Sequence, residues 1–442
     1  VIAMDDEESS LFGTIGYQAP EIAETGPTVA SDVYTVGRTL AVLLMDVPQE
    51  HGRFVEQLPG PATVPVLAEH DSLYRAILRA TDLNPSRRFS SMEEMADQLT
   101  GVLHEIAAAN SDSARPRMSN YFSPQRGVFG GGRDVPVDPH DVIAALPVPV
   151  VDPRDRGAAV LATTSGTSPA KLEHALSLAL SGAHEGSSSS IEIPLRLVRA
   201  SLETGAPKDA RKRLADLKAV IPGDWRLAWY SGQCALLEDK FDKAAADFDT
   251  VLAALPGELA PKLALAATAE LREMRQEAAR YYETIWRTDR SYVSAVFGLA
   301  RQRLRGADRA GAVRALDQVP TDSAHFTTAG ATAIEILLHG QTTESLDEQT
   351  LLDAGTRTTA LTVESTTKRA MIRLSVLGAA LDWLRAGNQN SATRLLGAAF
   401  DEADIRTGME RAYRELAHAT TDTWERIALV EKANTIRPRT RV

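Results

Sequence analysis

Hydrophobic positions recur every three to four residues through most of the chain, and this spacing predicts α-helices separated by short breaks. The pattern is clearest from residue 191 onward, where Gly or Pro closes each helical segment. Residues 1–110 also show helical patterns interrupted by Pro and Gly, whereas residues 111–190 are rich in Pro, Gly and Ser. We therefore predict a mainly α-helical protein whose middle part, 111–190, is a linker with one helix over 169–180.

The helical part repeats with a period of 34 residues. Four alanines stand at this spacing, and a large apolar residue follows each alanine by four positions: Ala210 and Leu214, Ala244 and Phe248, Ala278 and Tyr282, Ala312 and Leu316. Such a register is typical of two antiparallel helices per unit, with the small residue at the helix crossing and the large residue beside it. We predict an α-solenoid over 191–326, with further helical repeats or a cap over 327–442. The alternative is a run of unrelated amphipathic helices.

Charge is distributed unevenly along the chain. The net charge is −11, and residues 1–110 contain 17 acidic residues, 6 arginines and no lysine, so they carry the whole excess. An acidic segment of this kind argues against nucleic-acid binding, which needs a basic field. The opening residue, Val1, leads us to expect that the chain begins inside a longer gene product.

Other composition features exclude several classes of site. No apolar run is long enough to span a membrane. The single cysteine, Cys234, cannot form an intramolecular disulfide and suits a reducing cytoplasm. The nine histidines include no HExxH motif and no pair at i and i+4, so we expect no metal site.

Three motifs in the first quarter of the chain carry chemical information. Residues 13–21 read GTIGYQAPE, residues 32–37 read DVYTVG, and residues 84–89 read NPSRRF. In this order they resemble the end of the activation segment, the start of the central helix and the late Asp-Pro-x-x-Arg element of serine/threonine protein kinases. The resemblance implies that 1–110 is the C-terminal lobe of a kinase, from the activation segment onward.

The kinase resemblance assigns roles to individual residues. It implies that Thr14, Gly16 and Tyr17 position the substrate hydroxyl, and that Glu21 of Ala19-Pro20-Glu21 pairs with Arg88 to anchor the loop. Pro20 also disfavours helix in the residue before it. Asp32 stands where it would cap a helix over 33–45, and in kinases this residue holds the backbone of the catalytic loop. The alternative for Glu21 and Arg88 is a pair of unrelated exposed charges.

The groups that bind nucleotide in a kinase are missing from the sequence. Phosphoryl transfer uses a Gly-rich loop, a strand lysine, a catalytic-loop Asp and Asn, and a magnesium-binding Asp. The first lysine of the chain is Lys171, and neither HRD nor DFG occurs. We therefore expect the parent protein to use ATP and Mg²⁺, and this chain alone to bind no cofactor, to hold no catalytic residue and to be inactive.

The 34-residue units resemble the tetratricopeptide repeat. The unit with Gly232, Phe241, Ala244, Phe248 and Pro256 matches that pattern best. In that family the first helices line a partner groove, and the matching positions here include Arg199, Arg226, Trp229, Arg301 and Arg305. Such a groove would favour an acidic partner segment. The alternative is that these arginines are simply solvated.

Kinase motifs followed by these repeats resemble the soluble serine/threonine protein kinase G family of mycobacteria and corynebacteria. The wording of residues 18–22 (QAPEI), 34–40 (YTVGRTL) and 256–267 (PGELAPKLALAA) carries this resemblance. It implies a cytoplasmic enzyme that phosphorylates a forkhead-associated-domain regulator of 2-oxoglutarate and glutamate metabolism, with repeats that recruit substrate or form a homodimer. The alternative is a non-catalytic pseudokinase and repeat scaffold for protein interactions.

Overall fold

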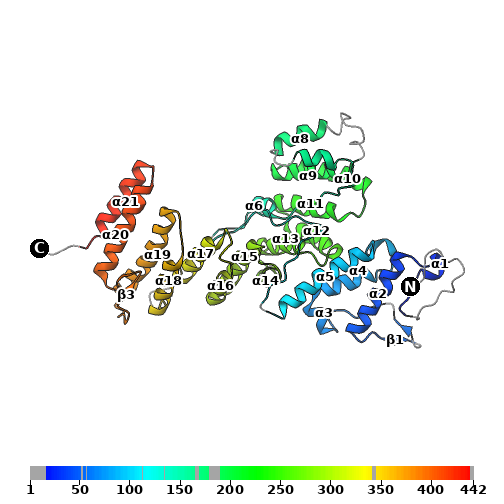
Figure 1. The fold of residues 1–442 in the computed structure, drawn as a ribbon, viewed down its shortest axis with the longest axis horizontal. Coiled ribbons are helices and arrows are strands. Elements are labelled where there is room, and N and C mark those ends of the chain that lie inside the picture. Colours follow the sequence, from blue (N-terminus) through cyan, green and yellow to red (C-terminus); the bar gives the residue numbers. More distant parts are fainter. Residues whose placement is uncertain are drawn as a thin grey trace. The chain divides into compact units, whose positions relative to one another are not determined.

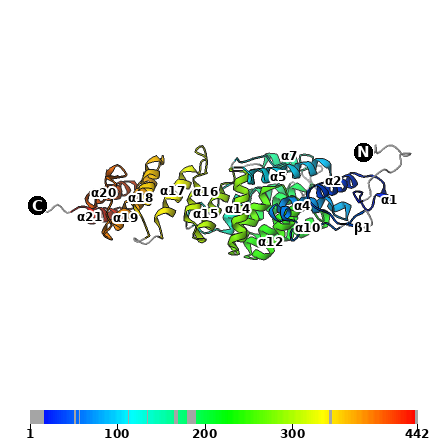
Figure 2. The ribbon, with the colours of Figure 1, turned by 90° about the horizontal axis from the view of Figure 1, so that it is seen from below.

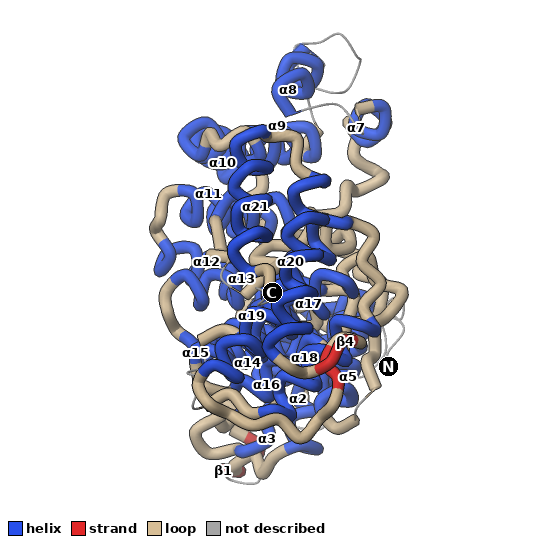
Figure 3. Tube along the Cα trace, turned by 90° about the vertical axis from the view of Figure 1, so that its left-hand side faces the viewer, coloured by secondary structure: helices blue, strands red, loops and turns tan. Residues whose placement is uncertain are grey.

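Nearly all of the regular secondary structure of the protein's described residues is helical, as a computed structural model shows (Figures 1 and 3). The structure describes residues 16–50, 53–55, 57–111, 113–133, 135–164, 169–178, 190–340 and 345–438. Strands in these residues are limited to two short antiparallel hairpins, β1 with β2 and β3 with β4. The chain forms two compact units: Val1–Phe129 with Val137–Tyr292, and Gly130–Pro136 with Val293–Val442. The predicted mainly α fold with a solenoid is confirmed.

The first unit begins with a helical region that we call the kinase-like lobe, residues 16–110. Its elements are α1 Ile22–Thr25, α2 Val29–Leu44, β1 Gln49–Glu50, β2 Arg53–Phe54, α3 Pro65–Glu69, α4 Asp71–Ala80, the 3₁₀ turn η1 Pro85–Arg87 and α5 Met92–Ala109. Val33, Ala80, Phe89 and Met95 form one small core, and each is at most 1% exposed. This core joins α2, α4 and α5 around the segment that follows η1.

Helix α2 begins four residues earlier than the sequence predicts. Its N-cap is Thr28, whose hydroxyl accepts a hydrogen bond from the amide of Ser31 at 3.1 Å, while the Ser31 hydroxyl accepts from the Thr28 amide at 2.8 Å. This reciprocal arrangement is a capping box. The expectation that Asp32 caps a helix starting at residue 33 is therefore wrong. Asp32 lies within the first turn and is exposed, where its charge favours the positive end of the helix dipole.

The described part of residues 111–190 is more ordered than a loose linker. It contains α6 Pro139–Ala145, α7 Ala158–Thr163 and α8 Pro169–Leu178. Only α8 coincides with the predicted helix. Large apolar side chains are buried in this region, among them Phe122, Phe129 and Ile143. A few apolar residues are therefore enough to hold this region in place, because they pack against neighbouring helices and do not have to form a core of their own.

The first three repeats complete the first unit. They are the helix pairs α9 Glu192–Glu203 with α10 Pro207–Val220, α11 Trp225–Leu237 with α12 Phe241–Ala254, and α13 Leu259–Leu271 with α14 Arg275–Thr288. All four predicted alanines, including Ala312 in the second unit, are fully buried, and the large residues that follow them are at most 8% exposed. At Gly232 a Cβ atom would lie only 2.6 Å from the ring of Phe248, which explains the small residue there.

The kinase-like lobe packs directly on these repeats. Helix α5 contacts α14, and α4 contacts α12. Gly101 of α5 meets Gly257 of the turn before α13 so closely that a Cβ on Gly101 would lie 2.3 Å from the Gly257 carbonyl oxygen. The buried Gln98 side chain accepts a hydrogen bond from the Gly257 amide at 2.9 Å. The compact units consequently do not follow the sequence divisions at 110, 190 and 326.

The second unit is also built of helices (Figure 2). Its elements are α15 Val293–Arg305, α16 Arg309–Leu316, α17 Phe326–Leu338, α18 Glu348–Ala360, α19 Thr366–Arg385, β3 Arg394–Leu395, β4 Ala398–Ala399, α20 Glu402–Ala419 and α21 Thr423–Ile436. Beyond α17 a core around Trp383 and Phe400 holds the helices together. The Trp383 indole donates a hydrogen bond to the Leu346 carbonyl at 2.8 Å.

We predict that Ala244→Leu destabilises the repeats by about 1 to 3 kcal/mol, because the added side chain overpacks a fully buried helix crossing. Urea unfolding followed by circular dichroism measures this loss. Ala246→Leu, at an exposed position of the same helix, is the matched control and should change stability little. Equal effects of the two substitutions would contradict the register.

We predict that Gly101→Leu separates the kinase-like lobe from the repeats, because no side chain fits against the Gly257 backbone. Calorimetric unfolding should then show a separate, earlier transition for the lobe. Ala96→Leu, at an exposed position of the same helix, should leave the transitions unchanged. A Gly101→Leu thermogram that matches the Ala96→Leu thermogram would rule out this docking contact.

Candidate functional site

Glu21 and Arg88 form the ion pair that the sequence predicts. Arg88 Nη1 lies 2.6 Å from Glu21 Oε1 and Arg88 Nη2 lies 2.9 Å from Glu21 Oε2, so the guanidinium holds the carboxylate through two parallel bonds. The Arg88 side chain is fully buried and that of Glu21 is 16% exposed. Hydrogen bonding from Arg88 outweighs the effect of burial and lowers the pKa of Glu21 below its ordinary value of 4.5.

Further contacts fix Arg88 in place. Its Nε donates to the Asp82 carbonyl at 2.7 Å and its Nη1 donates to the Ala30 carbonyl at 2.9 Å. The guanidinium also stacks over the Tyr34 ring, 4.7 Å from the ring centroid. Arg88 thus joins residue 21, helix α2 and the turn after α4. The C-terminal end of the loop at Glu21 is therefore held in one position.

A second buried arginine, which the sequence reasoning missed, holds the same loop. Arg38 of α2 is 1% exposed. Its Nε donates to the Gly16 carbonyl at 3.1 Å and its Nη2 donates to the Val55 carbonyl at 2.8 Å. The sequence indicates this role in one way only: Arg38 is a charged residue on the apolar stripe of a predicted helix, and arginine is rarely buried without partners.

Gly16 and Tyr17 lie against the β1 and β2 hairpin. Gly16 has φ of +96°, and a Cβ there would lie 2.9 Å from the Phe54 amide nitrogen, so both the backbone conformation and the space require glycine. The Tyr17 ring packs edge-on against the Phe54 ring, with centroids 5.3 Å apart. Ala19 is buried and Pro20 is exposed. Thr14, the third predicted substrate-positioning residue, lies outside the described residues.

One face of α2 is apolar yet exposed. Val29, Val36 and Leu43 recur at seven-residue spacing and are 42%, 41% and 78% exposed. Asp32 lies on the same stripe by its spacing. An apolar stripe of this extent on a helix is suited to packing against another protein segment.

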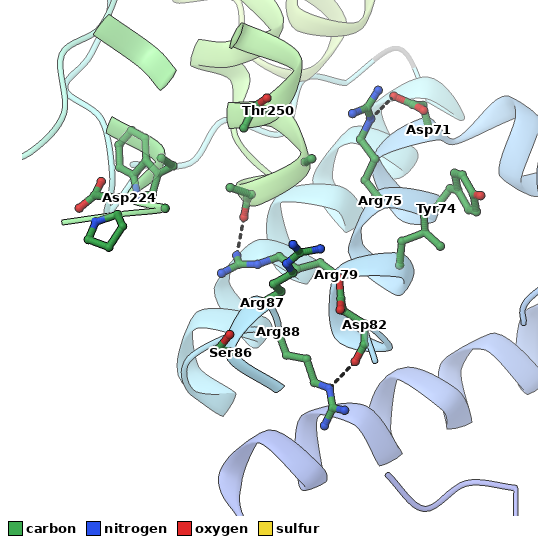
Figure 4. A pocket seen from close by; sticks show the side chains of 16 residues that line it. Asp71, Tyr74, Arg75, Arg79, Asp82, Ser86, Arg87, Arg88, Asp224 and Thr250 are labelled. Atoms are coloured by element: carbon green, nitrogen blue, oxygen red, sulfur yellow. Dashed lines mark hydrogen bonds and ion pairs between the residues drawn. The ribbon is translucent and has the colours of Figure 1, made fainter. Parts of the chain in front are cut away.

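A cleft of ≈ 990 Å³ lies between the kinase-like lobe and the second repeat (Figure 4). Most of its charged groups are already paired. Arg75 bonds to Asp71 and Asp249, and Arg79 bonds to Glu94 at 2.7 Å and to the Ala254 carbonyl. The cleft therefore serves mainly as a polar part of the interface between lobe and repeats.

Two of the predicted groove residues are covered by the chain itself. Trp229 is fully buried, and its ring packs against Phe122 of the middle region, with centroids 4.9 Å apart. Arg301, in the second unit, is 4% exposed and donates a hydrogen bond to the Gly130 carbonyl. The expectation that these two side chains face an open groove is corrected, because residues 122 and 130 occupy those positions.

The other three predicted groove residues differ from one another in their partners and exposure. Arg226 of α11 pairs with Glu192 and with Asp224. Arg199 of α9 bonds to Glu203, 2.8 Å away. Arg305 is exposed on α15 in the second unit. Arg199 therefore lies on α9, and Arg226 and Trp229 lie on the neighbouring helix α11 of the first unit. Arg301 and Arg305 lie on α15 of the second unit.

No residues in the described part of the chain are arranged to hold a metal ion. No group of three or more His, Cys, Asp or Glu side chains comes together there. Burial raises the pKa of the Cys234 thiol to about 12, so this cysteine is not a reactive nucleophile at neutral pH. None of the described helices has the length and apolar character of a transmembrane span.

Comparisons with known proteins agree with this arrangement. The profile of the protein kinase G tetratricopeptide repeat family matches residues 116–440. The chain is 44% identical over 446 residues to serine/threonine-protein kinase PknG of Mycolicibacterium smegmatis, and 43% identical over 447 residues to the protein of the same name from Mycobacterium leprae. Each alignment covers 97% of this chain and 58% of the relative, so the chain spans less than two thirds of the length of these relatives.

We predict that Glu21→Gln destabilises the kinase-like lobe by about 3 kcal/mol at neutral pH, because it leaves the buried Arg88 without its counter-ion. Since the pKa of Glu21 is lowered by folding, the pair contributes fully above pH ≈ 4.5, and its contribution is lost as pH falls through the lowered value. The variant should lose this part of the acid dependence of urea unfolding. Glu24→Gln, at an exposed position three residues later, should retain it.

Proposed function

Because the chain belongs to the protein kinase G family, whose repeat profile covers residues 116–440, we propose that it is part of a serine/threonine protein kinase. In this proposal the kinase-like lobe presents the substrate side of the active site, and the repeats hold protein partners. The two-pronged bond between Glu21 and Arg88 carries the proposal, because it joins two of the three kinase motifs 67 residues apart.

Contacts at the two ends of the segment from Gly16 to Glu21 support this role of the lobe. Arg88 fixes the end of the loop at Glu21, and Arg38 fixes its backbone at Gly16. Tyr17 packs on Phe54 between these two points. A loop held at both ends positions a bound peptide with little loss of entropy, and this positioning is much of what a kinase contributes to catalysis. Thr14 would select a Ser or Thr hydroxyl, as the family resemblance implies.

ATP and Mg²⁺ belong to the parent enzyme in this proposal. The residues of this chain do not fit a nucleotide site, because its sequence lacks the phosphate-binding lysine and the catalytic motifs, and its described residues hold no acidic metal cluster. We assign these groups to a further segment that packs on the exposed stripe Val29, Val36 and Leu43 of α2. Asp32, on the same stripe, would then bind the backbone of the catalytic loop.

The partner in this proposal is a forkhead-associated-domain protein that regulates 2-oxoglutarate and glutamate metabolism. Arg199, Arg226 and Arg305 are the candidate contacts for an acidic partner segment, and the repeats would recruit this substrate or form a homodimer. A cytoplasmic location is consistent with the use of ATP and with the reduced Cys234.

The second candidate function is a non-catalytic scaffold for protein interactions. The exposed stripe of α2 would then bind a protein segment that lacks the catalytic groups of a kinase.

We predict that Gly16→Ala in the intact kinase lowers kcat/KM for a protein substrate by about 10- to 100-fold, because the Cβ displaces the loop from Phe54. A radiolabelled phosphate-transfer assay measures this, and the KM for ATP should not change. Gly26→Ala is the matched control, because Gly26 also has positive φ but nothing lies within 4 Å of its Cβ position. Equal losses in both variants would remove the loop from substrate positioning.

A further inference from the structure

Three arginines converge on one glutamate at the start of the repeats. Arg196 and Arg199 come from α9, which also carries Glu203, and Arg126 comes from the middle region. Helices α6, α9 and α11 pack against one another around this cluster. Arg126 Nη1 and Arg199 Nε each lie 2.8 Å from Glu203 Oε1, and Arg196 Nη1 lies 3.5 Å from Glu203 Oε2.

The cluster has more hydrogen-bond donors than protein acceptors. A guanidinium carries five N–H donors. In the described part of the chain, Arg199 uses only its Nε, and Arg196 has an ion pair at 3.5 Å but no hydrogen bond. Arg196 Nη1 is also buried without a hydrogen-bond partner. Arg126 is better satisfied, because it also donates to the carbonyls of Ile143 and Leu146 at the end of α6.

The charges of the cluster do not balance. Three guanidinium groups face one carboxylate, which leaves a net charge of +2 on side chains that are 13% to 25% exposed. Burial, and to a smaller extent the positive charge of Arg199, lower the pKa of Arg126 and Arg196. The buried Tyr230 of α11 lies close to these arginines, and burial raises its pKa to about 12, so it adds no charge at neutral pH.

The neighbouring charges do not supply the missing anion. Glu192 is engaged with Arg226, and Asp224 binds the same arginine at 2.6 Å. By contrast, Arg211 in the same repeat region is held by Glu238 through Nε at 2.7 Å and Nη2 at 3.0 Å, and Lys240 contacts the same carboxylate at 2.8 Å. Two cations share one carboxylate there, whereas three share the carboxylate of Glu203.

We propose that Arg126, Arg196 and Arg199 form a binding site for a phosphate dianion, either free phosphate or the phosphate of a phosphorylated protein side chain. A dianion matches the net charge of +2, and its oxygens are acceptors for the unused guanidinium N–H groups of Arg196 and Arg199. Arg126, fixed by the end of α6, supplies a preorganised third side. The site is separate from the kinase-like lobe and does not depend on phosphoryl transfer by this protein.

Isothermal titration calorimetry of the whole chain with inorganic phosphate, at constant ionic strength, tests the proposal. We expect saturable binding that Arg196→Gln and Arg199→Gln each weaken by about tenfold, the loss that follows from a charged hydrogen bond. Arg211→Gln is the matched control and should bind phosphate as the wild type does. Absence of saturable binding to the wild-type chain, or an equal loss in the Arg211→Gln variant, would overturn the proposal.

A second pair of variants changes affinity in the opposite direction. Glu203→Gln removes the one acid in the cluster and should tighten phosphate binding, whereas Glu238→Gln should not. This result is readable even if an arginine variant fails to fold, as circular dichroism would show. Weaker binding in Glu203→Gln, or equal tightening in both glutamate variants, would contradict a local phosphate site.

Peptides distinguish the two sources of the phosphate. A phosphothreonine peptide that binds more tightly than free phosphate, while its unphosphorylated form does not bind, would support the site as one for phosphorylated protein segments. Equal affinity for the phosphopeptide and for free phosphate would support a site for the small anion. Binding of both the phosphorylated and the unphosphorylated peptide with the same affinity would overturn the proposal, because the phosphate group would then not be recognised.

Discussion

The contact between Gly101 and Gly257 sets the distance between the kinase-like lobe and the first repeats. Two backbones meet there without intervening side chains, so the lobe approaches far enough for Gln98 to bond the Gly257 amide. The buried Lys262 of α13 then reaches Glu105 of α5 at 3.0 Å. A larger residue at either glycine would separate all of these groups, and buried polar groups without partners are costly. The first unit is compact because of this close approach.

The loop before α1 is held by two buried arginines in addition to the packing of Tyr17 on Phe54. Arg88 holds its end and Arg38 holds its backbone, and most of the bonds that these two guanidinium groups make go to backbone carbonyl groups. A guanidinium suits this task, because its donors point in fixed directions in one plane. The loop conformation is therefore coupled to the folding of α2 and α4, and any substrate surface on the loop requires the whole lobe.

The sequence predicted the structure correctly where the spacing or the charge of side chains determines their contacts. The alanines at 34-residue spacing and their large neighbours are buried as predicted, and Glu21 pairs with Arg88. It failed where the partner is a backbone group. Arg38 binds backbone carbonyl groups, and because every residue has one, the sequence does not show which residues are its partners. Thr28 and Ser31 cap α2 in place of Asp32, because their hydroxyl groups bond the free backbone amides of a first turn that begins four residues earlier.

The position of Phe122 against Trp229 has a consequence for any peptide that binds the repeats there. Because both residues belong to one chain and one compact unit, the aromatic side chain meets the tryptophan at an effective concentration on the order of millimolar. A free peptide at micromolar concentration would have to bind this position on the order of a thousandfold more tightly than the internal segment to displace half of it. Occupancy of this part of the repeats is thus decided by competition with the chain itself.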